Sequence, residues 1–158
     1  MSSTNYFSKK GSSTQIKPFG TKFDTEYISS IGSDKTPMSI SSGKPQAKAP
    51  AGDSYLYESG QQALVFEITA KLKDASGYGY MSYLNFTLMD GQQNVCQRDS
   101  SSPVIKVQDK LPEGRMSGDE IKGQIAFVVP KGQDYSKYTL MFSSNSDTGA
   151  TAQVGWSG

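Results

Sequence analysis

The chain has 158 residues, 35% of them hydrophobic, and a net charge of +1, so it fits one domain with an extension and shows no charge excess typical of nucleic-acid or membrane-surface binding. It contains no histidine and one cysteine, which excludes Ser-His-Asp and Cys-His catalysis, histidine metal sites and an internal disulfide. The single thiol, Cys96, is interpreted as a small strand residue, because no histidine is present to activate it.

Residues 1–52 are rich in Ser, Lys, Gly and Pro, and their scattered apolar side chains follow no regular period. This segment holds seven lysines against three acidic residues, whereas residues 53–158 hold nine basic residues against twelve acidic ones. The composition predicts a polar, extended arm and linker over 1–52 that lies along another surface. Its expected anchors are the aromatic residues Phe7, Phe19, Phe23 and Tyr27.

From residue 53 onwards the pattern changes to short stretches in which apolar and polar residues alternate, as in strands with one buried face. Turn residues separate these stretches, notably Asp74 to Gly77, Asp90-Gly91 and Leu111 to Gly114. The expected strands cover 64–73, 84–89, 94–97, 104–107, 121–129, 138–142 and 154–156.

Six to eight short strands with regularly spaced turns, and no convincing amphipathic helix, predict an antiparallel β-sandwich over residues 53–158. In such a fold every second residue of a strand faces the other sheet. Phe66, Phe86 and Phe127 are therefore expected to meet in one core.

Motifs for catalysis or cofactor binding are absent from the sequence. Gly43-Lys44 is followed by Pro45 and is no phosphate loop, and no calcium-loop pattern is present. The adjacent acids Asp119 and Glu120 could serve a hydrolase only if they lined a cleft, and a solvated turn explains them more simply. We therefore expect no enzyme activity, no metal and no cofactor.

Tyrosines are the best positive signal for function. Tyr78, Tyr80 and Tyr83 crowd a glycine-containing loop, and Tyr55 and Tyr57 precede it. Tyrosine offers a stiff contact area with a polar tip, which suits recognition of a protein or a sugar. Packing at a sheet edge explains the same residues equally well.

Three segments in the order 64–72, 84–91 and 111–132 resemble a known family. They contain the Leu64 to Leu72 strand, the Phe86-Thr87-Leu88-Met89-Asp90-Gly91 hairpin, and Leu111-Pro112-Glu113-Gly114 followed by Ile121 to Gly132. The resemblance is to the immunoglobulin-like accessory domain of Gram-positive lipoproteins and phages, also labelled telomeric repeat-binding factor 2-like. It implies a non-catalytic, immunoglobulin-like sandwich similar to a mycobacterial immunoprotective extracellular protein.

Two functions follow as hypotheses. The first is a structural or interaction module of a larger assembly, such as a virion (capsid or tail decoration) or a surface layer. The arm would then lie on protein partners, including other copies of the chain. The alternative is a secreted or lipid-anchored domain at the bacterial cell surface that binds a protein or glycan through the tyrosine loop. The start of the sequence shows no secretory signal, which favours the first hypothesis. No stretch is apolar enough to span a membrane.

Overall fold

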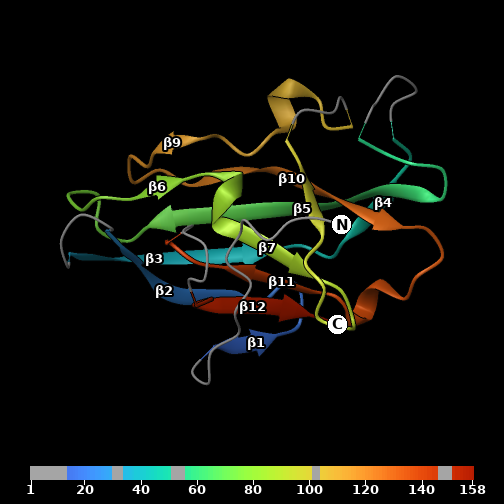
Figure 1. Ribbon diagram of the computed structural model, residues 1–158. Coiled ribbons are helices and arrows are strands. Elements are labelled where there is room, and N and C mark those ends of the chain that lie inside the picture. The colour runs from blue at the N-terminus through green and yellow to red at the C-terminus, as the bar shows by residue number, and fades with distance from the viewer. Residues whose placement is uncertain (1–13, 30–33, 51–55, 101–103, 146–150) are drawn as a thin grey trace.

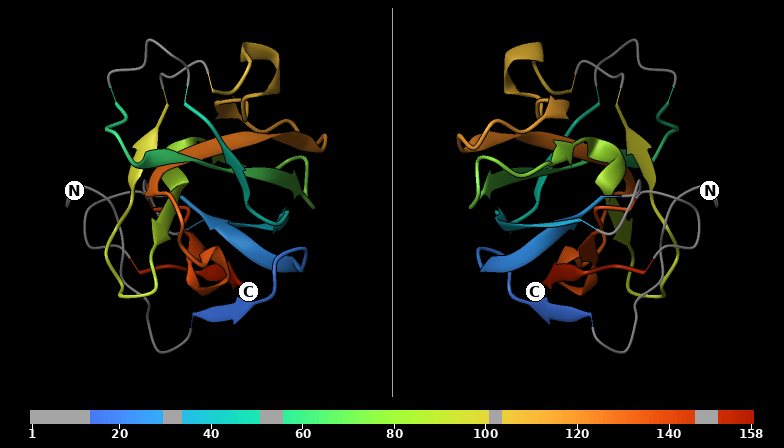
Figure 2. Two further views of the ribbon diagram at one scale, coloured as in Figure 1. Left: turned by 90° about the vertical axis from the view of Figure 1, so that its right-hand side faces the viewer. Right: turned by 90° about the vertical axis from the view of Figure 1, so that its left-hand side faces the viewer.

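The computed structural model describes residues 14–29, 34–50, 56–100, 104–145 and 151–158. These residues form two β-sheets packed face to face (Figures 1 and 2). The predicted all-β sandwich, built mainly from antiparallel strands, is therefore confirmed.

The larger sheet has six strands. Five follow the order β2 (Lys22–Ile28), β3 (Lys35–Ser42), β5 (Gln61–Leu72), β10 (Ile121–Pro130) and β8 (Gln97–Asp99), and the sixth, β4 (Gln46–Lys48), also pairs with β5. Its centre is the long antiparallel pair β5–β10, which extends from Gln61 opposite Pro130 to Ala70 opposite Ile121. β5 and β10 are the two segments in which the sequence alternates over the greatest length.

The smaller sheet has the order β1 (Gln15–Lys17), β12 (Val154–Ser157), β11 (Thr139–Phe142) and β7 (Phe86–Met89). β1 runs parallel to β12, so the N-terminal and C-terminal strands lie side by side at this edge. A separate two-stranded ladder joins β6 (Tyr80–Met81) to β9 (Gly114–Arg115). Three short 3-10 helices complete the described elements: η1 (Tyr83–Asn85), η2 (Val107–Asp109) and η3 (Tyr135–Lys137).

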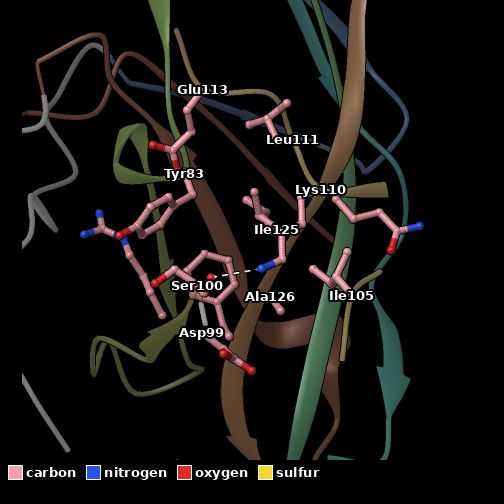
Figure 3. A pocket seen from close by; sticks show the side chains of 12 residues that line it. Tyr83, Asp99, Ser100, Ile105, Lys110, Leu111, Glu113, Ile125 and Ala126 are labelled. Atoms are coloured by element: carbon pink, nitrogen blue, oxygen red, sulfur yellow. Dashed lines mark hydrogen bonds between the residues drawn. The ribbon is translucent and has the colours of Figure 1, made fainter. Parts of the chain in front are cut away.

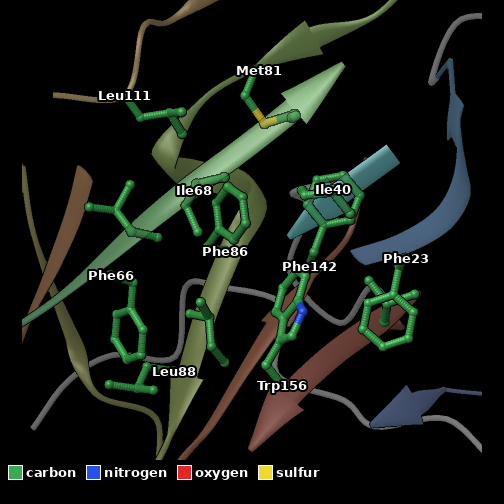
Figure 4. Close-up of a cluster of buried hydrophobic side chains, with 14 of the residues drawn as sticks. Phe23, Ile40, Phe66, Ile68, Met81, Phe86, Leu88, Leu111, Phe142 and Trp156 are labelled. Atoms are coloured by element: carbon green, nitrogen blue, oxygen red, sulfur yellow. The ribbon is translucent and has the colours of Figure 1, made fainter. Parts of the chain in front are cut away.

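One continuous hydrophobic core fills the space between the sheets (Figure 4). Phe66, Phe86 and Phe127 all belong to it, as predicted, and each is at most 1% exposed. Trp156 of β12 is fully buried, and its indole N–H donates a 2.8 Å hydrogen bond to the carbonyl oxygen of Thr21. Burial of this much aromatic surface is the main force that holds the two sheets together.

The prediction that residues 1–52 form a separate arm is wrong for residues 15–48, because this segment supplies β1 to β4 of the sandwich. Phe19, Phe23 and Tyr27 are buried in the core of their own chain. The Phe19 ring stacks on Phe66 at 5.7 Å, and Phe23 meets Trp156 edge-on at 5.5 Å. Alternate residues of β2 and β3 face inwards, so the Ser and Lys residues between them make the segment look like a solvated tail. Phe7 lies outside the described residues.

Side chains next to the end of β11 and the start of β12 form hydrogen bonds with the edge strand β2. Gln153 Nε2 donates to the carbonyl oxygen of Glu26 at 2.7 Å and to Thr25 Oγ1 at 3.1 Å. Gln153 Oε1 accepts from the backbone N–H of Ser144 at 2.6 Å, and Ser144 Oγ accepts from the Ile28 N–H at 3.1 Å. These bonds occupy part of the edge that could otherwise pair with another strand.

Residues 86–99 begin in the smaller sheet and finish in the larger one. Met89 and Val95 form an isolated bridge around the predicted Asp90-Gly91 turn, after which β8 pairs with β10. The segment predicted as a strand over 104–107 is not one in its described residues: Ile105 packs on the outer face of β5, and the chain then enters η2.

Candidate functional site

Two of the predicted tyrosines are exposed: Tyr80, in β6 of the β6–β9 ladder, and Tyr78, two residues before it. Tyr78 is 43% exposed and Tyr80 is 42% exposed, whereas Met81 of β6 is fully buried. Residues two apart in an extended segment point to the same side, so Tyr78 and Tyr80 project outwards together. Arg115 of β9 lies opposite Tyr80, and its guanidinium carbon is 5.4 Å from the centre of the Tyr78 ring. We call these three residues, Tyr78, Tyr80 and Arg115, the tyrosine–arginine platform.

The platform rests on the sandwich through tight contacts. Tyr78 meets Tyr27 of β2 edge-on at 5.8 Å, and its backbone N–H donates to Thr36 Oγ1 at 3.1 Å. Gly77 packs so closely on β3 that an added Cβ would lie 2.4 Å from Thr36 Cγ2. The Tyr78 ring is thus held in place by the strands beneath it, which reduces the entropy lost when it binds a partner.

Two aliphatic side chains outside the platform are also exposed. Ile28 at the end of β2 is 38% exposed and follows Tyr27, and Leu84 in η1 is 39% exposed. Their segments meet at Ser144, which accepts a hydrogen bond from the Ile28 N–H through Oγ and from Asn85 Nδ2 through its carbonyl oxygen. The remaining exposed large apolar residue of the described chain is Val107, in η2.

Tyr57 and Tyr83 do not join the platform. Tyr57 donates a 2.5 Å hydrogen bond to Asp99 Oδ2, and burial together with this carboxylate raises the pKa of Tyr57. Tyr83 lies on η1 and lines a separate pocket. Tyr55 lies outside the described residues. The structure therefore divides the predicted tyrosine group into an exposed pair and at least two side chains used elsewhere.

The pocket beside Tyr83 lies between η1, the 104–113 segment and the edge of β10 (Figure 3). Its apolar walls come from Ile105, Leu111 and Ile125, and the Lys110 ammonium donates to the carbonyl oxygen of Ser100 at 3.2 Å. The cavity volume is about 40 Å³, far below the roughly 300–1,000 Å³ of typical small-molecule sites. This pocket has room for water and not for a metabolite.

Arg98 at the pocket has a structural role that the sequence did not reveal. It is 7% exposed, and its Nε and Nη2 donate to the carbonyl oxygen of Phe86 at 2.9 and 2.7 Å. Nη2 also donates to the carbonyl oxygen of Leu84 at 3.1 Å. The guanidinium thereby ties β8 to the start of β7, at the point where the chain changes sheets.

Asp119 and Glu120 are exposed and line neither the Tyr83 pocket nor the open groove between residues 90–92 and 130–138. Burial, with a smaller effect of the Asp90 carboxylate, raises the pKa of the Cys96 thiol to about 12. Within the described ranges no group of three or more His, Cys, Asp or Glu residues could hold a metal ion, and no helix is long and apolar enough to cross a membrane.

Comparisons with known proteins identify the fold and no family. No family profile and no curated protein matches the sequence, so the specific family suggested by the sequence segments is not supported. Three solved structures do match. The Bacillus subtilis yjhA protein is 18% identical over 80% of this chain and 81% of its own, with a TM-score of 0.61. A candidate lipoprotein of the same species, ycdA, is 18% identical with a TM-score of 0.55, and the match covers 77% of this chain but 34% of ycdA.

The third structure is MPT63, a secreted protein from Mycobacterium tuberculosis. It is 11% identical, with a TM-score of 0.68, and the match covers 94% of this chain and all of MPT63. At these identities the likeness establishes the fold alone. The chain has the immunoglobulin-like β-sandwich architecture predicted from its sequence, in the form also found in MPT63.

Proposed function

We propose that this protein is a non-enzymatic binding domain that acts outside the cell, secreted or anchored at the surface, and recognises a macromolecular partner through the tyrosine–arginine platform. The observation that carries the proposal is the outward projection of Tyr78 and Tyr80 from a tightly packed support. Tyrosine and arginine, together with tryptophan, are the residue types enriched among those that dominate the binding energy of protein interfaces.

The extracellular location is supported by the fold likeness to a secreted mycobacterial protein and to a candidate lipoprotein. The hypothesis of a virion or surface-layer component depended in part on aromatic side chains of an arm that were free to contact a neighbour. Phe19, Phe23 and Tyr27 are buried in the chain's own core, so they no longer support it. The domain at the cell surface is therefore the function we favour.

The proposal is tested by adding labelled, purified protein to intact cells of the organism that makes it. We expect saturable binding that the double variant Tyr78→Ala/Tyr80→Ala weakens at least about tenfold, the scale of losing hot-spot residues. Val107→Ala is the matched control, because Val107 is 83% exposed on a different part of the surface. Equal binding by the wild type and the double variant would refute the proposed role of the platform.

A further inference from the structure

Arg115 is the platform residue whose bonding capacity is unused. Its guanidinium contacts the Tyr78 ring, and the described part of the chain gives it no hydrogen bond and no ion pair. The single ion pair in that part joins Lys73 to Asp24, both of them exposed. An arginine side chain keeps its charge at all physiological pH values and carries five N–H donors in a planar fork.

The position of Arg115 fits an incoming carboxylate. The guanidinium is held against an aromatic ring, so its planar fork is partly oriented before binding. Two parallel N–H···O bonds to a carboxylate would then form beside Tyr78 and Tyr80, where a bound partner excludes water. Charge-assisted bonds of this kind are about twice as strong as bonds between neutral groups.

Other exposed apolar side chains indicate what carries the carboxylate. Ile28 and Leu84 present aliphatic surface on segments that meet at Ser144. Aliphatic side chains gain by contact with the apolar side chains of a peptide, whereas a phosphate-rich polymer offers them nothing to bury. On this basis, and resting on the function proposed above, we infer that the platform binds an exposed segment of a partner protein in which an Asp or Glu is flanked by apolar residues.

The test uses a display library of short random linear peptides, selected on the immobilised full chain. We expect the selected peptides to carry Asp or Glu beside aliphatic or aromatic residues. For the best synthetic peptide, Arg115→Gln is expected to weaken binding roughly 10- to 100-fold, as for loss of a charge-assisted bond at an interface. Replacing the peptide's acid by its amide should cause a similar loss, and should add little further loss in the Arg115→Gln protein.

Two controls separate binding from folding and from general charge. Arg115→Gln should unfold at the same temperature as the wild type within a few degrees, because Arg115 is exposed. Lys131→Gln removes one exposed positive charge at the β10–η3 turn and should leave peptide binding unchanged. If Lys131→Gln weakened peptide binding as much as Arg115→Gln, the effect would be one of net charge alone, and the inference would be overturned.

The outcomes distinguish this inference from the function on which it rests. Peptides that need Tyr78 and Tyr80 but carry no acid, or that ignore Arg115→Gln, would overturn the carboxylate and leave the platform as a binding surface. Failure to select any peptide that depends on the tyrosines would overturn the peptide inference. In a competition assay, polyphosphate is added at the same concentration of negative charges as the acidic peptide. If it displaced the peptide, the peptide inference would likewise be overturned, and an anionic polymer would be the better ligand. If the tyrosine variants also bind intact cells normally, the proposed function fails as well.

Discussion

Replacing Phe23 by alanine tests whether the N-terminal segment is part of the sandwich. Phe23 is 4% exposed in β2 and packs edge-on against Trp156 of the other sheet. Truncation of a buried Phe to Ala costs about 3–5 kcal/mol of the free energy of unfolding, and this figure already includes the lost contact with Trp156. Domains are stable by about 5–15 kcal/mol, so the loss is a large share of the total. For a chain of this size it lowers the melting temperature by roughly 6–20 °C.

The measurement is urea unfolding of the full chain followed by circular dichroism and by tryptophan fluorescence, because Trp156 is the only tryptophan. Lys22→Ala is the control, since Lys22 is the exposed neighbour in the same strand, and it should change the free energy of unfolding by no more than about 0.5 kcal/mol. If Phe23→Ala is as mild as Lys22→Ala, residues 22–28 behave as a solvated arm and the described packing is wrong.

Three further predictions concern the frame that carries the platform. Gln153→Ala removes the bonds that close the edge of β2 and should lower the free energy of unfolding by about 1–3 kcal/mol; a loss below about 0.5 kcal/mol would contradict the role given to this side chain. Gly123→Ala should lower the free energy of unfolding by at least about 1–3 kcal/mol in the same assay, because the new Cβ would lie 2.3 Å from Leu111 Cα. Gly43→Ala is the control and should be tolerated far better, because the atom nearest to its new Cβ is 3.9 Å away. Cys96 should react with iodoacetamide at pH 8 far more slowly in the folded protein than in urea, since a pKa raised from 9.0 to about 12 leaves roughly a thousandfold less thiolate. The same pKa shift means that the neutral thiol contributes its full share to the free energy of unfolding below about pH 9, and that this share is lost as the pH rises towards 12. Equal alkylation rates in the folded and the urea-unfolded protein would contradict the burial of this thiol. So would a wild-type free energy of unfolding that stays constant between about pH 9 and pH 12 and differs from that of Cys96→Ser by a constant amount.

The sequence predicts those strands well in which apolar residues occupy every second position without interruption. β5 and β10 pair with each other over their length, and the predicted turn at Asp90-Gly91 is present, with Asp90 Oδ1 accepting from the backbone N–H groups of Gln92 and Asn94. In these segments the local pattern and the global fold agree, which is the condition under which sequence reasoning succeeds.

The N-terminal strands were missed because polar residues share their inward-facing positions. In β2 the inward residues are Phe23, Thr25 and Tyr27, and in β3 Thr36 and Ser42 share the buried face with Met38 and Ile40. Thr and Ser at such positions dilute the apolar alternation. The spacing of Phe23 to Tyr27 and of Met38 to Ile40 in steps of two is the signal that could have identified both strands.

The candidate site was predictable in part. The loop with Tyr78 and Tyr80 follows from the sequence, because large aromatic residues beside glycines break the strand pattern. Arg115 is 35 residues from Tyr80 in the chain, and it is brought opposite Tyr80 only by the β6–β9 ladder. Long-range pairing of two-residue strands leaves no periodic trace in a sequence, so the third member of the platform became visible only in the structure.

The most direct test of the account is amide hydrogen exchange of the full chain, measured by NMR. The platform is in place only if Tyr27 and Thr36 lie beneath Tyr78, which requires β2 and β3 to belong to the sandwich. Residues 38–41 pair with β2 on one side, and residues 38–42 pair with β5 on the other, so the amides bonded there should exchange about as slowly as those of β10. Exchange of residues 38–42 at the rate of an unstructured peptide, while β10 stays protected, would contradict the account.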